Sequence, residues 1–360
     1  MPILFALPEI SVVPIERLLT TILIISLIAL ILSQRQKIFF IPAITSLISL
    51  ISLISFDQMR LQPWVYQYLL LLTIFALHNW ETEDDSDSNR TLGLLQIMIA
   101  GLYFWSGVQK MNFTFSHETL PMLLSPLQNL FPSIQLPFVF FGISIALTET
   151  LIGAGLLFRK TKRLSVLLAV TMHATILGLL IAKDYNSIVW IWNAVLMLIV
   201  VIAFWKNDVS IKQSITSSSA GYWKVWLAKS VTLASVLLPI LSFAGWWDMY
   251  LSGALYSGNT PVAVIRINED TFGNLPAKAQ QTVFRTKSRG EQMLPLFEWA
   301  IADLNVPTYP EIRVFKQVAR EMCKLTNDKG QVELIIKERP AIFDGNYEIT
   351  QISCLELEKN

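Results

Sequence analysis

Eight apolar stretches, each close to the length of a membrane-spanning helix, occupy most of the first 245 residues. Crossing about 30 Å of hydrocarbon takes roughly 20 such residues. The stretches are 16–34, 38–55, 64–80, 92–110, 136–158, 164–182, 187–205 and 222–245. A hydrophobic fraction of 53%, a charged fraction of 15% and a mean hydropathy of +0.50 agree with membrane residence. The sequence therefore predicts an all-α polytopic membrane bundle of about eight transmembrane helices.

Two segments differ from the other apolar stretches. The first apolar run follows Glu16 and Arg17, and no small-residue cleavage site separates it from the second, so we expect it to be retained as a span. The segment 113–135 is apolar but is interrupted by Pro121, Pro126 and Pro132. Because proline interrupts backbone hydrogen bonding, we predict an interfacial or re-entrant loop there.

Lysine and arginine collect in the short loops that eight spans place on one side. The strongest cluster is Arg-Lys-Thr-Lys-Arg at 159–163, supported by Arg35 and Lys37 and by Lys206 and Lys212. Such clusters favour the cytoplasmic face. An acidic loop at 81–87 falls on the same side, where acidic residues carry little weight in the rule. The N-terminus and the C-terminal region are then expected outside, in a periplasm or lumen.

The composition becomes that of a soluble domain at about residue 260. We divide the chain into a transmembrane domain at 1–259 and a small α+β extramembrane domain at 260–360. Strands are predicted at 262–267, 332–336 and 349–355, and helices at 291–304 and 311–325. This domain contains both cysteines, Cys323 and Cys354, which form no metal-ligand pattern, so no metal is expected; they would form one disulfide in an oxidising compartment. The domain could serve as a lid or as a docking surface for a protein partner.

A net charge of +1 without a long basic block gives a nucleic-acid partner no support.

The most informative polar residue is Lys110, which ends the fourth apolar stretch within Tyr103-Phe-Trp-Ser-Gly-Val-Gln-Lys-Met-Asn112. One interpretation is a lysine whose ammonium reaches the lipid headgroups. The other is a desolvated, neutral amine that acts as a base, with Gly107 allowing a backbone or a ligand to approach one turn earlier.

Two further polar side chains flank the basic turn at 159–163. Glu149 lies ten residues before Arg159, and His173 lies ten residues after Arg163. In an antiparallel hairpin both would lie about 15 Å from the turn and could be neighbours near the bilayer midplane. They would form either a structural interhelical hydrogen bond or a proton relay or ligand contact. His78 closes the third stretch beside Trp80 and could be a simple interfacial histidine.

Several segments, in order, resemble the vitamin K-dependent gamma-carboxylases and the wider set with their horizontally transferred transmembrane domain. Tyr103-Phe-x-x-Gly-Val-x-Lys110-x-Asn112 is similar to the family segment YFxAGVKKLD, and Gln96 precedes it at a familiar spacing. The other similar segments are Ala76-Leu-His78-Asn-Trp80 (family ANHYW), Gly155–Arg163 followed by His173 (LLFFDKTR and FH), and Trp247-Asp248-Met249 (WDM). The likeness covers roughly residues 60–267.

This resemblance implies a chemistry and a set of site residues. The carboxylases oxidise a reduced naphthoquinone with oxygen, and the base formed in that reaction removes a proton from glutamate before carbon dioxide adds. The resemblance implies Lys110 as the base that deprotonates the hydroquinone, assisted by His78. The substrate-binding residues expected with them are Glu149, His173, Gln96, Trp247 and Asp248. The implied cofactor is a reduced naphthoquinone of the vitamin K type.

The chain also departs from the family pattern. The lysine pair is reduced to Gln109-Lys110, the aspartate is Asn112, and there is no room for the large lumenal domain of the carboxylases. Antiparallel third and fourth spans would put His78 and Lys110 at opposite membrane faces unless one helix is broken. Two hypotheses therefore stand: an enzyme acting on a quinol or another lipid-soluble substrate, or a non-catalytic partner, like DoxX or MauE proteins, that supports another protein through residues 260–360. We expect residence in a bacterial plasma membrane, in contact with lipid.

Overall fold

The computed structural model describes residues 13–32, 36–78, 85–133, 137–207, 209–216, 223–287, 290–326 and 328–357. Seven of its helices are long and apolar enough to cross a membrane. They are α1 (Val13–Leu32), α2 (Gln36–Phe56), α4 (Asp85–Gln109), α6 (Phe138–Leu156), α7 (Lys162–Ala182), α8 (Ser187–Phe204) and α10 (Trp223–Leu237) with its 3-10 extension η3 (Leu238–Ala244). The chain is an integral membrane protein built on a helical bundle.

The remaining predicted span is shorter than expected. Helix α3 (Pro63–Leu77) has 15 residues, which is about 22 Å at 1.5 Å per residue. Pro63 occupies its first turn, and His78 ends it in an extended conformation. The described structure therefore supports seven full-length spans, and α3 is an apolar helix too short to cross a typical bilayer unaided.

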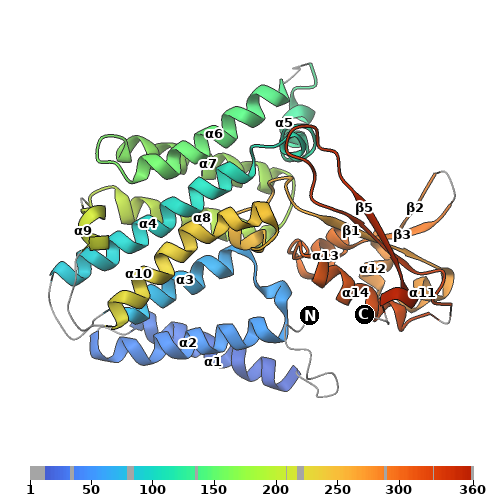
Figure 1. The fold of residues 1–360 in the computed structure, drawn as a ribbon, viewed down its shortest axis with the longest axis horizontal. Coiled ribbons are helices and arrows are strands. Elements are labelled where there is room, and N and C mark those ends of the chain that lie inside the picture. The colour runs from blue at the N-terminus through green and yellow to red at the C-terminus, as the bar shows by residue number, and fades with distance from the viewer. Residues whose placement is uncertain are drawn as a thin grey trace.

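Successive long helices run in opposite directions, so their connections gather at two ends (Figure 1). We call the end next to the C-terminal domain the domain end and the opposite end the basic end. The α6–α7 turn with Arg159 and the segment with α9 (Ile211–Thr216) both lie at the basic end (Figure 1). The expected grouping of these basic connections on one side agrees with this arrangement. Arg35 and the acidic residues 81–84 lie outside the described residues.

Helices α4 and α6 cross closely because glycines remove side chains at their contact. A Cβ atom at Gly107 would lie 2.4 Å from the backbone nitrogen of Thr150 and 2.6 Å from the carbonyl oxygen of Ala146. A Cβ atom at Gly153 would lie 2.4 Å from the backbone nitrogen of Phe104. Small residues at such crossings let two backbones approach and pack tightly in a membrane.

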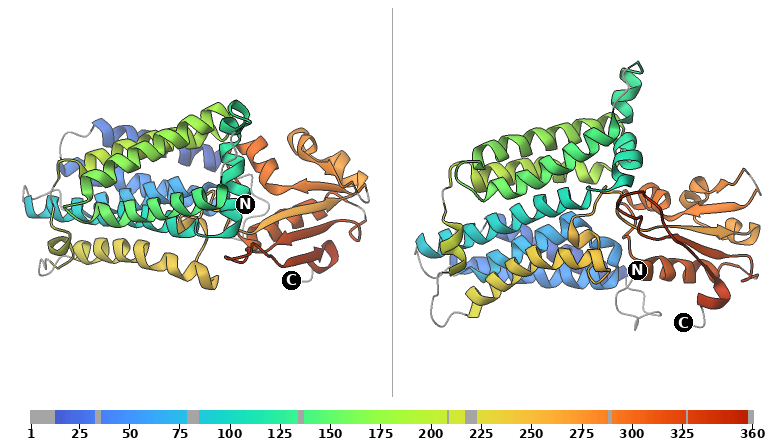
Figure 2. Two further views of the ribbon diagram at one scale, coloured as in Figure 1. Left: turned by 90° about the horizontal axis from the view of Figure 1, so that it is seen from above. Right: turned by 45° about the horizontal axis from the view of Figure 1, so that its top comes forward.

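The segment 113–135 differs from its predicted structure. Residues 115–130 form a π-helical turn, η2 (Phe115–Thr119), followed by α5 (Leu120–Leu130), so the predicted loop is wrong for this part. The helical run is continuous from residue 113, and Pro121 and Pro126 both lie within it. The π-helical turn directly precedes Pro121, where the proline interrupts the regular ladder of backbone hydrogen bonds. Helix α5 runs across the bundle end rather than along the spans (Figure 2).

The C-terminal domain contains a five-stranded antiparallel sheet in the order β2-β3-β1-β4-β5. The strands are β1 (Val262–Ile267), β2 (Phe284–Arg285), β3 (Gln292–Pro295), β4 (Glu333–Lys337) and β5 (Ile349–Ser353). The helices are α11 (Glu269–Asn274), α12 (Ala277–Thr282), α13 (Leu296–Leu304), α14 (Ile312–Cys323) and α15 (Cys354–Leu357). The prediction for β1 is confirmed, but the predicted helix 291–304 begins only at Leu296, because 292–295 pair with β1.

One face of this sheet forms the domain core. Ile265 of β1 and Leu294 of β3 are fully buried and pack in one cluster with Phe315 of α14. A disulfide joins Cys323, at the end of α14, to Cys354, directly after β5. The two cysteines, for which the sequence left a disulfide open, are thus bonded, which links the end of α14 to the start of α15, directly after the edge strand β5.

The segment between α13 and α14 docks the domain on the bundle. Tyr309 is fully buried in a cluster that also contains Trp64 of α3 and Leu180 of α7. The Gln62 side chain donates a hydrogen bond to the carbonyl of Pro307 at 3.0 Å, and the Tyr250 hydroxyl donates to that of Thr308 at 3.1 Å. The domain is therefore held against the domain end by side chains of both parts.

Candidate functional site

The central feature of the bundle is an ion pair between Lys110, directly after α4, and Glu149 of α6. Lys110 Nζ lies 2.8 Å from Glu149 Oε2, and the two side chains are only 12% and 9% exposed. Charged groups at such positions are disfavoured unless they are paired, and they mark functional sites in membrane proteins more often than structural ones. The sequence spacing predicts that Glu149 lies near His173. In the structure its direct partner is Lys110.

The close α4–α6 crossing explains why these two residues meet. Gly107 lies against Ala146 and Thr150, so it is level with about residue 148 of α6. Lys110 is three residues further along antiparallel α4 and is therefore level with about residue 145. Helix α6 begins at Phe138, seven residues away, so Lys110 lies roughly 10 Å inside the domain end of α6. The lysine turns back toward Glu149 instead of extending outward to the headgroups.

Three hydrogen bonds use all the N–H groups of a protonated Lys110. Nζ donates to Glu149 Oε2, to Ser106 Oγ at 2.6 Å and to the Ser106 carbonyl at 3.2 Å. An ammonium has three donors. A further ligand would reach Nζ only by replacing one of these contacts, and the rotatable Ser106 hydroxyl is the most easily replaced.

A second polar chain lies beside the ion pair. The Tyr103 hydroxyl is 2.7 Å from His173 Nε2, and His173 Nδ1 is 2.8 Å from Asn193 Oδ1. Because the Asn193 amide nitrogen donates to the Val189 carbonyl, its oxygen accepts from His173. His173 therefore carries its proton on Nδ1, and Tyr103 donates to Nε2. Glu149 is close enough to interact electrostatically with Tyr103 and with His173. The two predicted residues, Glu149 and His173, therefore lie in one buried polar cluster.

The two positions that depart from the carboxylase pattern attach this site to the following segment. Gln109 donates to Ser242 Oγ at 2.9 Å and accepts from the Asn259 side chain at 2.7 Å. Asn112 donates to the Ser257 carbonyl at 2.8 Å and accepts from the backbone N–H of Phe115 at 2.8 Å. Residues 242–259 thus cover the end of α4 next to Lys110.

Two predicted site residues lie far from Lys110. His78 Nδ1 is 2.7 Å from Thr91 Oγ1, near the start of α4. Thr91 precedes Lys110 by 19 residues, about 28 Å along the helix, so the expectation that His78 and Lys110 lie at opposite ends agrees with the structure. Gln96 is fully buried on α4 about 21 Å from Lys110, where it donates to the Ala203 carbonyl at 2.7 Å. Its Oε1 has no hydrogen-bond partner among the described residues.

The other predicted residues, Trp247 and Asp248, lie where the C-terminal domain docks. Asp248 accepts a hydrogen bond from the Tyr309 hydroxyl at 2.7 Å and pairs with Arg313 at 2.5 Å. Trp247 Nε1 is buried and has no partner among the described residues. These residues belong to the domain junction and are not part of the Lys110 cluster.

Glu311 completes the junction and was not predicted from sequence. It accepts a hydrogen bond from the Met249 backbone at 3.0 Å and pairs with Arg313 at 3.2 Å. Burial, followed by repulsion from Asp248, raises the pKa of the Glu311 carboxyl from 4.5 to about 7. The junction thus holds two carboxylates against one guanidinium.

Comparison with models of protein families, with curated proteins and with solved structures finds no match to this chain. Tyr103, Ser106 and Asn193 are the residues of the cluster that sequence analysis did not single out. Tyr103 and Ser106 lie seven and four residues before Lys110, a helical spacing that puts them on its side of α4 and could have indicated them.

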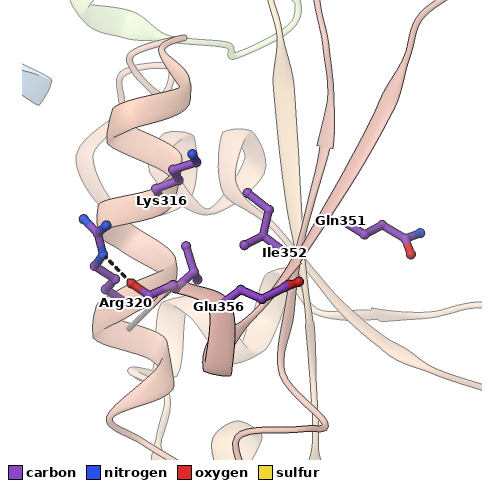
Figure 3. A pocket seen from close by; sticks show the side chains of 6 residues that line it. Lys316, Arg320, Gln351, Ile352 and Glu356 are labelled. Atoms are coloured by element: carbon purple, nitrogen blue, oxygen red, sulfur yellow. Dashed lines mark hydrogen bonds between the residues drawn. The ribbon is translucent and has the colours of Figure 1, made fainter. Parts of the chain in front are cut away.

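A shallow cavity on the C-terminal domain is a second location with polar lining. It has a volume of about 230 Å³ and lies between α14, with Lys316 and Arg320, and the chain from β5 into α15 (Figure 3). Arg320 Nε donates to the Leu357 carbonyl at 3.1 Å (Figure 3). The Glu356 carboxylate, also in the lining, accepts from Ser353. The polar groups here are largely used within the domain.

Proposed function

We propose that this protein is a membrane enzyme whose Lys110–Glu149 pair takes a proton from a hydroxyl group of a lipid-soluble substrate of the quinol class. The observation that carries the proposal is an amine and a carboxylate in direct contact, shielded from water and about 10 Å inside the bundle. An amine and a carboxylate within hydrogen-bonding distance of each other can act as general base and acid toward a bound hydroxyl group.

The pair can supply a neutral base without leaving an isolated charge. Transfer of one proton from Nζ to Oε2 across the 2.8 Å contact leaves an amine and a carboxylic acid. A substrate hydroxyl that replaces Ser106 Oγ can then give its proton to the amine. The O–H bond breaks, and the resulting oxyanion lies beside the new ammonium, which stabilises it.

A reduced naphthoquinone fits this donor set. The charge of Lys110 is already matched by Glu149, so the site favours a neutral hydroxyl over a permanent anion. When bound, such a quinol would supply a weakly acidic hydroxyl and the electrons for reduction of oxygen. Tyr103, held by His173, lies next to the pair and could orient an aromatic substrate. We assign His78 no part in this proton transfer, because it binds Thr91 near the other end of α4.

We also infer that the C-terminal domain faces an oxidising compartment. The Cys323–Cys354 disulfide supports this side, since such bonds persist outside the cytosol. The basic residues of the α6–α7 turn, at the opposite end, support a cytoplasmic location for that end (Figure 1). A bacterial plasma membrane with the domain in the periplasm satisfies both.

The test is oxygen-dependent epoxidation of a reduced naphthoquinone by the full-length protein in lipid nanodiscs. The reaction balances as quinol plus O₂ giving quinone epoxide plus water. The variant Lys110→Met/Glu149→Gln removes both charges together, and Lys183→Met, a lysine that donates to the Met122 carbonyl, is the matched control. We expect the double variant to lose at least about 10²-fold in epoxide formation, the usual contribution of a general base, and the control to keep wild-type activity. Equal rates in the double variant and wild type would overturn the proposal.

One observation favours the non-catalytic alternative. All three N–H groups of Lys110 are already satisfied within the chain, as expected of a structural ion pair. On this alternative, folded wild-type protein forms no epoxide. The 260–360 domain would then be the place to look for a protein partner.

A further inference from the structure

We propose that the β4–β5 hairpin of the C-terminal domain inserts its tip into the lipid interface at the domain end of the bundle. The hairpin connects Lys337 to Ile349 and reaches back from the sheet to the bundle (Figure 1). We therefore expect the lipid bilayer itself to cover this apolar tip. This inference is independent of the chemistry at Lys110.

Two contacts fix the position of the hairpin tip along the axis of the bundle. The backbone N–H of Phe113 donates to the carbonyl of Ile342 at 2.8 Å. A Cβ atom at Gly345 would lie 2.6 Å from the Phe113 ring, so the ring and the hairpin backbone are in contact. The tip is therefore fixed to the chain three residues beyond Lys110.

Phe113 lies beside α6, at a point along the bundle axis that this membrane-spanning helix covers. Lys110 is level with about residue 145 of α6, and Ser116 lies against Gly142, where a Cβ atom would be 2.3 Å from its hydroxyl. Phe113 comes between these two points, and α6 begins only at Phe138. The hairpin tip thus extends past the level at which α6 starts and enters the outer part of the bundle.

The side chains at the tip are those of a lipid-contacting loop. Phe343 is 93% exposed, and Ile342 beside it is 37% exposed. An aromatic ring left this open is unfavourable in water and favourable at the membrane boundary, where aromatic residues are enriched. Trp246, 77% exposed just after the last span, is a second aromatic of this kind at the domain end.

Polar groups flank the tip where headgroups would lie. Lys337 Nζ lies over the ring of Tyr347 at 4.8 Å, and the Arg339 guanidinium lies over the ring of Phe243 at 4.8 Å. Asp344, next to Phe343, accepts hydrogen bonds from the side chain and backbone of Asn346, which satisfies its carboxylate locally. The Arg339 guanidinium also donates to the Asn259 side chain and to the Ser242 carbonyl, so Lys337 is the exposed cation of this hairpin. An apolar tip with an exposed cation further along the hairpin is the arrangement expected for shallow insertion.

The test is a spin label at Phe343→Cys in nanodiscs, with Phe284→Cys as the matched control. The two native cysteines are joined to each other, so a label reacts only with the new thiol. Phe284 is 49% exposed on β2, at the edge of the sheet away from the bundle (Figure 1). Because Phe343 is almost fully exposed, its replacement removes little packing, and an unchanged thermal transition checks the fold.

We expect the label at residue 343 to collide with oxygen several-fold more often, relative to a water-soluble nickel complex, than the label at 284. Equal ratios at the two positions would overturn the proposal. Low accessibility to both reagents with dipolar coupling between labels would show a second copy of the chain covering the tip, and would also overturn it. Neither outcome depends on epoxide formation, so this test and that of the proposed function fail separately.

Discussion

The Lys110–Glu149 pair and the Asp248–Glu311–Arg313 junction both join opposite charges, but they balance those charges differently. In the bundle one ammonium meets one carboxylate, and every donor of the ammonium has a partner. At the junction two carboxylates share one guanidinium, and the pKa of Glu311 rises to about 7. At the first site each charge inside the membrane has one opposite charge beside it. At the second site one carboxyl group has no cation of its own, and its charge changes with pH.

The largest effect should come from breaking the balanced pair on one side only. Lys110→Met leaves the Glu149 carboxylate without its ion-pair partner at a 9% exposed position. We expect a loss of about 3–5 kcal/mol in unfolding free energy, as for other buried pairs that lose one member. The measurement is denaturation in nanodiscs or matched detergent. Lys110→Met/Glu149→Gln should recover most of the loss, and a double variant no more stable than the single one would contradict a balanced pair.

Loss of the disulfide should destabilise the C-terminal domain, which carries Glu311 and Arg313 of the junction, and should spare the bundle. Cys323→Ser/Cys354→Ser opens a loop with a sequence separation of 31 residues, which corresponds to about 3–4 kcal/mol by chain entropy. Hydrogen exchange should rise in the sheet of the C-terminal domain and stay low around Lys110. Equal loss of protection in both parts would mean that they unfold as one unit.

Widening the α4–α6 crossing should weaken the pair without touching its charges. In Gly107→Ala the new Cβ would meet the Thr150 backbone nitrogen at 2.4 Å, so the helices must separate. We expect a loss of about 1–3 kcal/mol from overpacking and a weaker Lys110–Glu149 coupling in a double-mutant cycle. Gly178→Ala is the control, since a Cβ there has nothing within 4 Å. If the two alanine variants are equally stable, the close crossing does not hold the pair.

The smallest effect is expected from titration of the junction. Because the pKa of folded Glu311 is about 7 against an ordinary 4.5, the folded chain keeps a proton that the unfolded chain releases. Stability should therefore fall as pH rises from about 4.5 to 7, by about 1–2 kcal/mol after allowance for the solvent that reaches this side chain, which is 20% exposed.

Glu311→Gln tests this pH dependence directly. The amide can still accept from the Met249 backbone, so we expect a flatter profile of unfolding temperature between pH 5 and 8 and higher stability at pH 8. Glu321→Gln, an exposed acid of α14 paired with Lys324, is the control and should leave the profile unchanged. A profile that Glu311→Gln does not alter would assign the pH dependence to other groups.

The sequence predicted the bundle well because apolar length is a local property. Each predicted stretch coincides with a helix, and only α3 is shorter than a span. The prolines of 113–135 predict a loop, but Pro121 and Pro126 both lie within a continuous helical run at 113–130, whose π-helical turn directly precedes Pro121. The sequence predicts helix for the short strand 292–295, because its pairing with β1 and β2, which are distant in the chain or short, makes it a strand.

The site was predicted in part. Counting residues from the α6–α7 turn brought Glu149 and His173 to the same depth, and both lie in the polar cluster. The direct partner of Glu149 could not be found this way, because Lys110 reaches it through the α4–α6 crossing at Gly107, a contact between segments far apart in the chain. Trp247 and Asp248 precede the first strand, and their sequence position gave no indication that they would meet Tyr309 and Arg313.

The most direct test of the account is the position of the Lys110 ammonium in a lipid bilayer. Solid-state NMR of protein labelled with ¹⁵N-lysine and ¹³C-glutamate can measure dipolar coupling from Nζ to the Glu149 carboxyl carbon and to lipid phosphorus, with Lys110→Met assigning the signal. The account predicts a coupling to the carboxyl carbon for a separation of roughly 4 Å or less, as a direct hydrogen bond requires, and none to phosphorus. Coupling to phosphorus without coupling to Glu149 would mean that Lys110 extends to the headgroups, and the proposed acid–base site would not exist.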